Sequence, residues 1–249
     1  MRSVVIPIVI VTIAGLAAFA LPQRSPGVDA EEFSDASPSI ADTPAVAWTR
    51  PAGPIRVALQ AGHWKAAEAP DEQARLRTNG TRGGGKAEWE VNLGIARHAA
   101  RLLEEAGYTV AILPTTIPPG YWADVFVAIH ADGNNSPSAS GYRAAAPRRD
   151  RTGRAADLAA ILNETYGAAT GLPRYPLITR RMRGYYAFNS RRYEHALHSM
   201  TVGVIIETGF LTNASDRRII VGEQERAARG IAQGVMRFVE LQNTDASSP

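Results

Sequence analysis

Residues 124–133 read DVFVAIHADG, and this stretch indicates the class of fold. The run from Val125 to Ile129 is wholly apolar, which is typical of a strand covered on both faces in a parallel sheet. The polar residues His130 and Asp132 follow at once. Because sites in α/β sheets form at the carboxyl ends of strands, we take His130 as a candidate functional residue.

Two other apolar segments have the same form. Residues 55–59 (IRVAL) lead to Gly62 and His63, and residues 202–206 (VGVII) lead to Glu207. Together with further segments of alternating type, they predict an α/β fold: a single layered domain with a mostly parallel, twisted sheet flanked by helices. The other expected elements are strands at 108–113 and 141–146 and helices at 88–106, 152–171 and 223–241.

The start of the chain differs from the rest in composition. Arg2 precedes an uncharged apolar run over residues 3–21, in which residues 18–20 (AFA) match a signal peptidase site. We expect residues 1–21 to be either a cleaved signal peptide or a retained N-terminal membrane anchor, so that the remainder is exported. The other segments are expected to be a disordered linker (22–53), one folded domain (54–242) and a polar tail (243–249).

Composition excludes several classes of protein. The 249 residues are 45% hydrophobic and 20% charged, which is typical of a globular chain and not of a disordered or coiled-coil one. Cysteine is absent, which excludes disulfides, thiolate metal ligands and a cysteine nucleophile. The net charge of +3 gives no argument for a nucleic-acid partner, and we expect none.

Three polar residues share one position in the predicted fold. His63, His130 and Glu207 each follow a short apolar strand, and Glu88 opens the first predicted helix. Each also has a simple structural interpretation: hydrogen-bonded histidines, a favourable carboxylate at a helix start, and a cap for the next helix. Together, two His and one Glu match the ligands of catalytic zinc sites, and a second Glu would then act as general base.

Four segments resemble the zinc-dependent N-acetylmuramoyl-L-alanine amidases of the amidase 3 family, which act on peptidoglycan. The resemblance runs from Ile55 to the last predicted helix and implies the phosphorylase/hydrolase-like amidase fold. In the order of the family, the segments are VALQAGH (57–63), EWEVNL (88–93), ADVFVAIHAD (123–132) and IETGFLTN (206–213).

The resemblance implies that His63, Glu88 and His130 bind one Zn²⁺ and that Glu207 is the catalytic general acid and base. Glu90 is an alternative to Glu88 as the ligand. We favour Glu88 because it lies five residues before Leu93, as in the family. The implied reaction is hydrolysis of the amide between N-acetylmuramic acid and L-alanine by zinc-activated water. The implied location is the periplasm, the cell wall or the outside of the cell.

The sequence also departs from the family. Gln60 and Ala61 stand where the family usually has Asp-Pro, and the loss of a carboxylate would weaken the support of His63. Two alternatives therefore stay open: a zinc peptidase acting on another amide, and a degenerate, non-catalytic wall-binding module.

A basic and aromatic segment precedes the last predicted strand. Residues 174–193 hold six Arg and four Tyr without an acid. They form either a groove for the carboxylates and sugars of peptidoglycan or a solvated basic face. Arg181, Arg183 and Asn213 are the candidate substrate-binding residues. We expect His98, His195 and His198 to be structural.

Overall fold

The computed structural model describes residues 48–246, and the chain divides into two units, Met1–Arg50 and Pro51–Pro249. All the elements named below belong to the second unit. The predicted leader (1–21), most of the predicted linker (22–53) and the end of the predicted tail (243–249) lie outside the described residues. Within residues 48–246, no helix is both long enough and apolar enough to cross a membrane.

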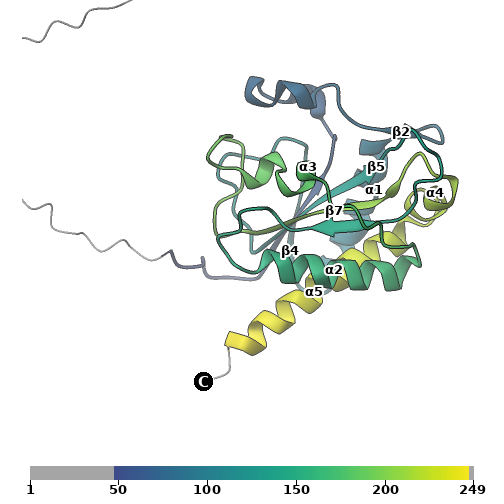
Figure 1. Cartoon of the computed structure of the whole chain (residues 1–249). Helices are drawn as coiled ribbons and strands as arrows, with labels where there is room; N and C mark the ends of the chain where they lie inside the picture. The colour runs from purple at the N-terminus through teal and green to yellow at the C-terminus, as the bar shows by residue number, and fades with distance from the viewer. Residues whose placement is uncertain (1–47, 247–249) are drawn as a thin grey trace, which may run out of the picture. The chain divides into compact units, whose positions relative to one another are not determined.

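A mostly parallel sheet forms the centre of the second unit (Figure 1). Its strand order is β4-β1-β5-β7-β6. Strand β1 pairs in parallel with β4 and β5, and β5 pairs in parallel with β7. Only the edge strand β6 is antiparallel among these described strands. The prediction of a mostly parallel sheet is therefore confirmed. The strands are β1 (Arg56–Ala61), β4 (Thr109–Leu113), β5 (Val125–Asp132), β6 (Arg143–Ala145) and β7 (Val202–Phe210).

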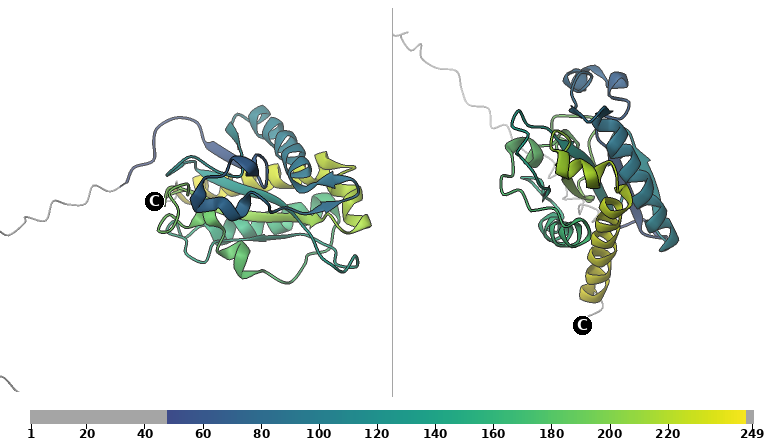
Figure 2. Two further views of the ribbon diagram at one scale, coloured as in Figure 1. Left: turned by 90° about the horizontal axis from the view of Figure 1, so that it is seen from above. Right: turned by 90° about the vertical axis from the view of Figure 1, so that its right-hand side faces the viewer.

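Three long helices cover one face of the sheet: α1 (Glu88–Glu105), α2 (Ala155–Thr170) and α5 (Gln224–Ala246). Helix α5 lies between the other two (Figure 2). Successive side chains of a strand point to opposite faces, so Leu59 and Val127 pack towards these helices whereas Ala58 and Phe126 pack on the other face. That second face is covered by the connections around Ile117 and Met182.

Helix α1 forms where the spacing of apolar residues predicts it. Val91, Ile95, Ala99 and Leu103 recur at helical spacing and are buried against the sheet. The helix begins at Glu88, directly after the short strand β3 (Lys86–Ala87), which pairs with β2 (Arg82–Gly83). This start places the Glu88 side chain at the same edge of the sheet as the end of β5.

The structure differs from the sequence prediction in the length of two strands and in several additional short elements, and it excludes the alternative interpretation of Glu207 as a helix cap. Strands β5 and β7 continue beyond their apolar runs, because His130 pairs with Glu207 in the ladder between them, so both residues lie inside strands. Asn213, and not Glu207, caps the helix that follows β7. The elements that were not predicted are η1 (Ala66–Glu68), η2 (Asp71–Leu76), β2, β3, α3 (Arg180–Arg183), η3 (Tyr186–Phe188) and α4 (Ala214–Ile220).

The end of β7 is held in place by a buried carboxylate of α4. Asp216 is fully buried and accepts hydrogen bonds from the Phe210 N–H at 2.8 Å and the Gly141 N–H at 2.8 Å. It also accepts one from the Ser140 hydroxyl at 2.6 Å. The contacts connect α4, the end of β7 and the chain that leads into β6, so they fix the strand that carries Glu207.

Replacing this carboxylate should destabilise the fold strongly. Asp216→Ala leaves two backbone N–H groups and one hydroxyl without their acceptor, and we expect it to lower the free energy of unfolding by about 3–5 kcal/mol. Asp216→Asn keeps one acceptor oxygen and should lose less, and Ser140→Ala should lose about 1 kcal/mol. Urea denaturation of the three variants tests this order. Equal stability of Asp216→Ala and the unmodified chain would contradict it.

Candidate functional site

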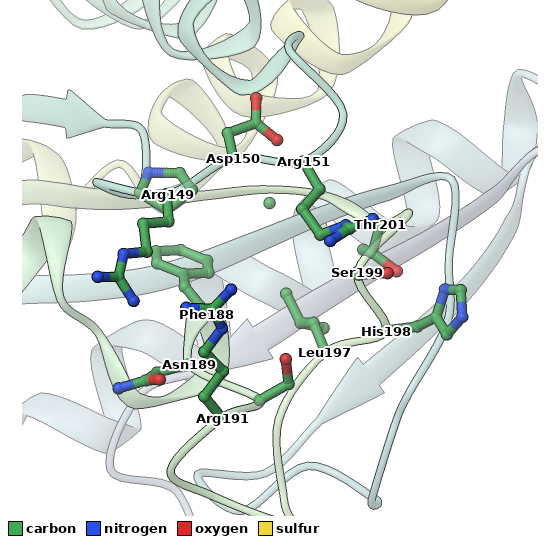
Figure 3. Close-up of a pocket in the computed structure, with 13 residues that line it drawn as sticks. Arg149, Asp150, Arg151, Phe188, Asn189, Arg191, Leu197, His198, Ser199 and Thr201 are labelled. Carbon is green, nitrogen blue, oxygen red and sulfur yellow. The ribbon is translucent and has the colours of Figure 1, made fainter. Parts of the chain in front are cut away.

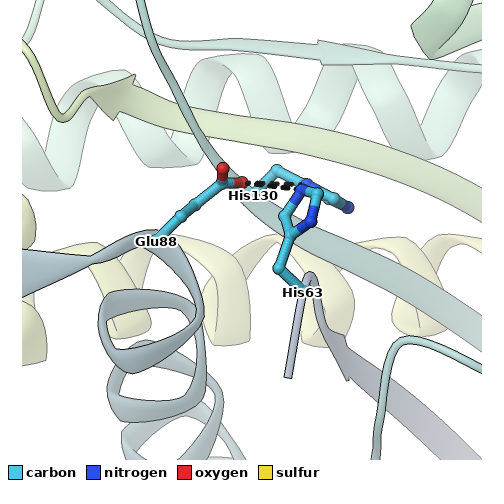
Figure 4. A group of neighbouring side chains, drawn as sticks. All are labelled: His63, Glu88 and His130. Carbon is cyan, nitrogen blue, oxygen red and sulfur yellow. Dashed lines mark hydrogen bonds and ion pairs between the residues drawn. The ribbon is translucent and has the colours of Figure 1, made fainter. Parts of the chain in front are cut away.

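Three side chains from separate elements converge beside the carboxyl ends of β1 and β5 (Figure 4). The Oε1 atom of Glu88 lies 3.1 Å from Nδ1 of His130 and 3.4 Å from Nε2 of His63. One potential ligand atom from each residue lies within 4.8 Å of the others. The three residues therefore present two imidazole nitrogens and a carboxylate oxygen to one point.

A glycine allows the two histidines to approach each other. The ring centroids of His63 and His130 are 5.0 Å apart, and a Cβ atom added to Gly62 would lie 2.4 Å from Cε1 of His130. His63 itself has a φ of 63°, a left-handed conformation that a side-chain-bearing residue rarely adopts. The left-handed backbone at His63, directly after β1, is thus part of what positions its ring.

Glu88, and not Glu90, faces the histidines. Glu88 is 5% exposed, and its Oε2 atom accepts a hydrogen bond from the Thr81 N–H at 2.8 Å, while Oε1 faces the two rings. Glu90 turns back to accept a hydrogen bond from the Ala87 N–H at 2.8 Å, and its carboxylate lies 3.7 Å from Lys86. Glu90 therefore has a structural role at the start of α1.

The charges in this group depend on burial and on the contacts among the three residues. Burial lowers the pKa of His63. Burial opposes ionisation of Glu88, but its hydrogen bond to His130 and the charges of both histidines bring the pKa of Glu88 below its usual value. Glu88 is therefore a carboxylate at neutral pH, and the point where the three side chains meet favours a cation.

Asn92 supports this group and was not predicted from the sequence. Its side-chain amide is fully buried and donates to the carbonyl oxygen of Gly62 at 3.0 Å and to Oε1 of Glu88 at 3.4 Å. Asn92 thereby connects α1 to the turn that carries His63. A polar residue four positions after Glu88, within the apolar face of a helix, is the pattern that could have identified it.

Glu207 lies beside His130 in the β5–β7 ladder and is partly buried. Burial raises the pKa of Glu207 to about 8, the negative charges of Asp132 and Glu88 add to this rise, and His130 and Arg143 oppose it. A carboxyl with a pKa near neutrality can both accept and release a proton. The structure thus places a group suited to proton transfer next to the three converging side chains.

Arg143 is another residue near the site that was not predicted from the sequence. It pairs with Glu207 in the antiparallel ladder between β6 and β7 and is 5% exposed. Its guanidinium group donates to the Asp132 carboxylate and lies 4.8 Å from the ring centroid of Tyr175. Glu207 is therefore flanked by His130 on one strand and by Arg143 on the other. No spacing in the sequence relates Arg143 to Glu207, because the two strands are joined by a long connection.

Gln60 connects to His130, and not to His63 as the sequence suggested. Its Oε1 atom accepts a hydrogen bond from the Tyr185 hydroxyl at 2.8 Å, and the same hydroxyl oxygen lies 3.2 Å from Nε2 of His130. The described hydrogen bonds of Gln60 thus lead to His130 rather than to His63. The cause is its position on β1: the side chain points to the face of the sheet that Tyr185 and Tyr186 cover.

The predicted substrate-binding residues lie on other segments. Arg181 and Arg183 are exposed on α3. Asn213 uses its side chain within the protein: Oδ1 accepts from the Ser215 N–H at 2.8 Å and from the Asp216 N–H at 3.1 Å. Its amide group donates to the carbonyl oxygen of Pro137 at 2.8 Å. These contacts account for Asn213 as a helix cap, and its binding of substrate stays a prediction.

Two cavities differ in their relation to the converging residues. A cavity of about 500 Å³ is lined by His63, Glu88 and Trp89, so it gives access to two of the three converging residues. A second cavity, of about 250 Å³, is lined by Arg149 and Thr201 among others and lies at the start of β7 (Figure 3). Because Glu207 lies towards the other end of β7, only the larger cavity is part of the candidate site.

Comparisons with known proteins identify the family of this chain. The sequence profile of the amidase 3 family, described as N-acetylmuramoyl-L-alanine amidase, matches residues 57–237. This range includes His63, Glu88, His130 and Glu207. A search of curated proteins found no significant match.

Solved structures of amidases share the fold. The N-acetylmuramoyl-L-alanine amidase AmiC2 of Nostoc punctiforme is 20% identical, over 76% of this chain and 99% of that chain, with a TM-score of 0.55. Ami1 from Mycobacterium smegmatis is 17% identical, over 75% of this chain and 97% of that chain, with a TM-score of 0.57. The N-acetylmuramoyl-L-alanine amidase from Clostridium difficile 630 is 22% identical, over 76% of this chain and 98% of that chain, with a TM-score of 0.55. With the family profile spanning nearly all of the folded unit, this chain belongs to the amidase 3 family of N-acetylmuramoyl-L-alanine amidases, which are cell-wall hydrolases.

Proposed function

We propose that this hydrolase cleaves the amide between N-acetylmuramic acid and L-alanine with one Zn²⁺ held by His63, Glu88 and His130. The observation that carries the proposal is the convergence of their ligand atoms within 4.8 Å of one another, beside Glu207. No other group of at least three potential ligands of this kind occurs in the described residues.

The three residues fit a zinc ion by their chemistry. Two imidazole nitrogens and one carboxylate oxygen form a ligand set of catalytic zinc sites, in which a fourth position stays open. Glu88 is ionised, and the Thr81 N–H and Asn92 amide hold its two oxygens in place. When bound, zinc would polarise the scissile carbonyl group and make water more acidic.

Glu207 is the residue that we assign to proton transfer. It accepts the proton of the attacking water and passes that proton to the amine that leaves as the amide bond breaks. A cation held by the neighbouring residues would lower the pKa of Glu207 from about 8 towards neutrality, because opposite charge favours the carboxylate. Arg143, on the neighbouring strand β6, attracts this carboxyl by its positive charge, and His130 lies beside it on β5.

The position of the cavity supports binding of a polymer at the surface. Its walls include Trp64 and Trp89, which offer flat apolar surfaces of the kind that pack on sugar rings. They also include Arg82, which offers a positive charge for stem-peptide carboxylates. Arg181, Arg183 and Asn213 are further candidates for contacts with the peptide.

We also propose that residues 1–21 direct export, and that residues 3–21 act as a membrane tether where the leader is retained.

Replacing Glu207 should separate catalysis from metal binding. Glu207→Gln removes the proton acceptor but none of the three ligands, so we expect turnover to fall by about 10³-fold or more with zinc still bound. The assay incubates the chain with purified peptidoglycan and quantifies newly exposed N-terminal L-alanine, and zinc content is measured on the same samples. Activity within tenfold of the unmodified chain would show that Glu207 is not the proton-transfer group.

Removing one ligand should weaken zinc binding. His63→Ala deletes one of three ligand atoms, and we expect the zinc dissociation constant to rise by at least about 100-fold. A chelator should stop alanine release from the unmodified chain, and added zinc should restore it. His98→Ala is the control, because His98 lies on α1 beside Glu225, away from the site. Equal zinc affinity of His63→Ala and the control would contradict the ligand assignment.

A further inference from the structure

We propose that Gln60 and Tyr185 are positioning residues that fix which nitrogen of the His130 ring carries the proton, so that Nδ1 is free to bind metal. The inference rests on the zinc site proposed above. It is carried by a chain of hydrogen bonds whose donors and acceptors can be assigned one after another. The chain runs from the carbonyl oxygens of Pro114 and Thr115, through Gln60 and Tyr185, to His130.

The first step fixes the orientation of the Gln60 amide. Its Nε2 atom lies 2.7 Å from the Thr115 carbonyl oxygen and 3.2 Å from the Pro114 carbonyl oxygen. A carbonyl oxygen can only accept, so the NH₂ group of Gln60 must face this side and Oε1 the other. Gln60 is fully buried, and no water is needed to satisfy the arrangement.

The second step fixes the direction of the Tyr185 hydroxyl. Oε1 of Gln60 can only accept a hydrogen bond, and it lies 2.8 Å from the Tyr185 hydroxyl oxygen. The phenol has one proton, and this contact uses it. Towards His130, whose Nε2 atom is 3.2 Å away, the Tyr185 oxygen can therefore only accept.

The third step fixes the proton on the histidine. Nε2 of His130 must carry a hydrogen to donate to Tyr185. When the ring is neutral, as a metal ligand must be, its free lone pair therefore lies on Nδ1. Nδ1 is the atom that lies 3.1 Å from Glu88, on the side of the converging ligands (Figure 4). The opposite tautomer would place a proton where the metal binds and two lone pairs between His130 and Tyr185.

Packing keeps Tyr185 in the position that this chain requires. Its ring lies edge-on to His130, with centroids 5.4 Å apart, and contacts the rings of Tyr186 at 4.8 Å and Phe188 at 5.7 Å. Tyr186 is a close neighbour whose hydroxyl makes different hydrogen bonds. Its hydroxyl oxygen lies 2.6 Å from Nε2 of Gln60 and donates to the Thr115 carbonyl. Tyr186 therefore offers a matched control, because its described hydrogen bonds do not include His130.

Tyr185→Phe removes the acceptor of the His130 Nε2–H and leaves the aromatic ring in place. Using the full-length chain, we expect its zinc dissociation constant, measured by competition with a chromophoric chelator, to rise by about 10–100-fold. Tyr186→Phe should stay within about threefold of the unmodified chain, because the direct support of a metal ligand is kept. Equal zinc affinity of the Tyr185→Phe and Tyr186→Phe variants would overturn the inference.

A second measurement observes the proton itself. In the zinc-loaded full-length chain labelled with ¹⁵N-histidine, we expect the NMR signals of His130 to show a hydrogen on Nε2 and metal on Nδ1. Metal on Nε2 would overturn the inference even if Tyr185→Phe weakens binding. The failure of the proposed function looks different: an unmodified chain that binds no zinc and releases no alanine overturns the zinc site, and the positioning role with it.

Discussion

The parallel pairing of β5 with β7 is the constraint on which the site depends. It places His130 directly beside Glu207, while the pairing of β1 with β5 brings the turn at Gly62 to the end of β5, where the Gly62 N–H donates to the Ile129 carbonyl at 2.9 Å. Side chains alternate along a strand, so a slip of one residue in either ladder would turn His130 or Glu207 to the opposite face. Such a slip is costly because the two faces of β5 carry different apolar side chains, and exchanging them would mismatch the packing on both sides of the sheet.

Burial of charge is the second requirement, and it explains why the site needs more residues than its ligands. Glu88 is surrounded by the core, so its carboxylate is stable only with donors such as the Thr81 N–H and the Asn92 amide. Burial raises the pKa of Glu207 to about 8, and the negative charges of Asp132 and Glu88 add to this rise. Two carboxyl groups in one region are thus set to different tasks by their surroundings: one to hold positive charge, the other to exchange a proton.

Much of this arrangement could be predicted from sequence, because it depends on local patterns. The apolar runs before His63, His130 and Glu207 predicted the strands, and strand ends share one edge of a parallel sheet. Tyr185 and Arg143 could not be found in this way. Tyr185 reaches Gln60 across 125 positions, and Arg143 meets Glu207 through an antiparallel edge strand of three residues. Such contacts arise from how long connections cross the sheet, and no periodicity in the sequence encodes them.

Gln60 shows how a residue can be misjudged when the face of its strand is unknown. By its place in the sequence, three residues before His63, it suggested a lost carboxylate. In the structure its amide group faces two carbonyl oxygens, and a carboxylate there would have no hydrogen to donate to them. A carboxylate would also add negative charge beyond Tyr185, which already lies within the electrostatic influence of Glu88 and Glu207. A neutral side chain that both donates and accepts supports His130 without raising the pKa of Glu207 further, and this makes glutamine well suited to its position.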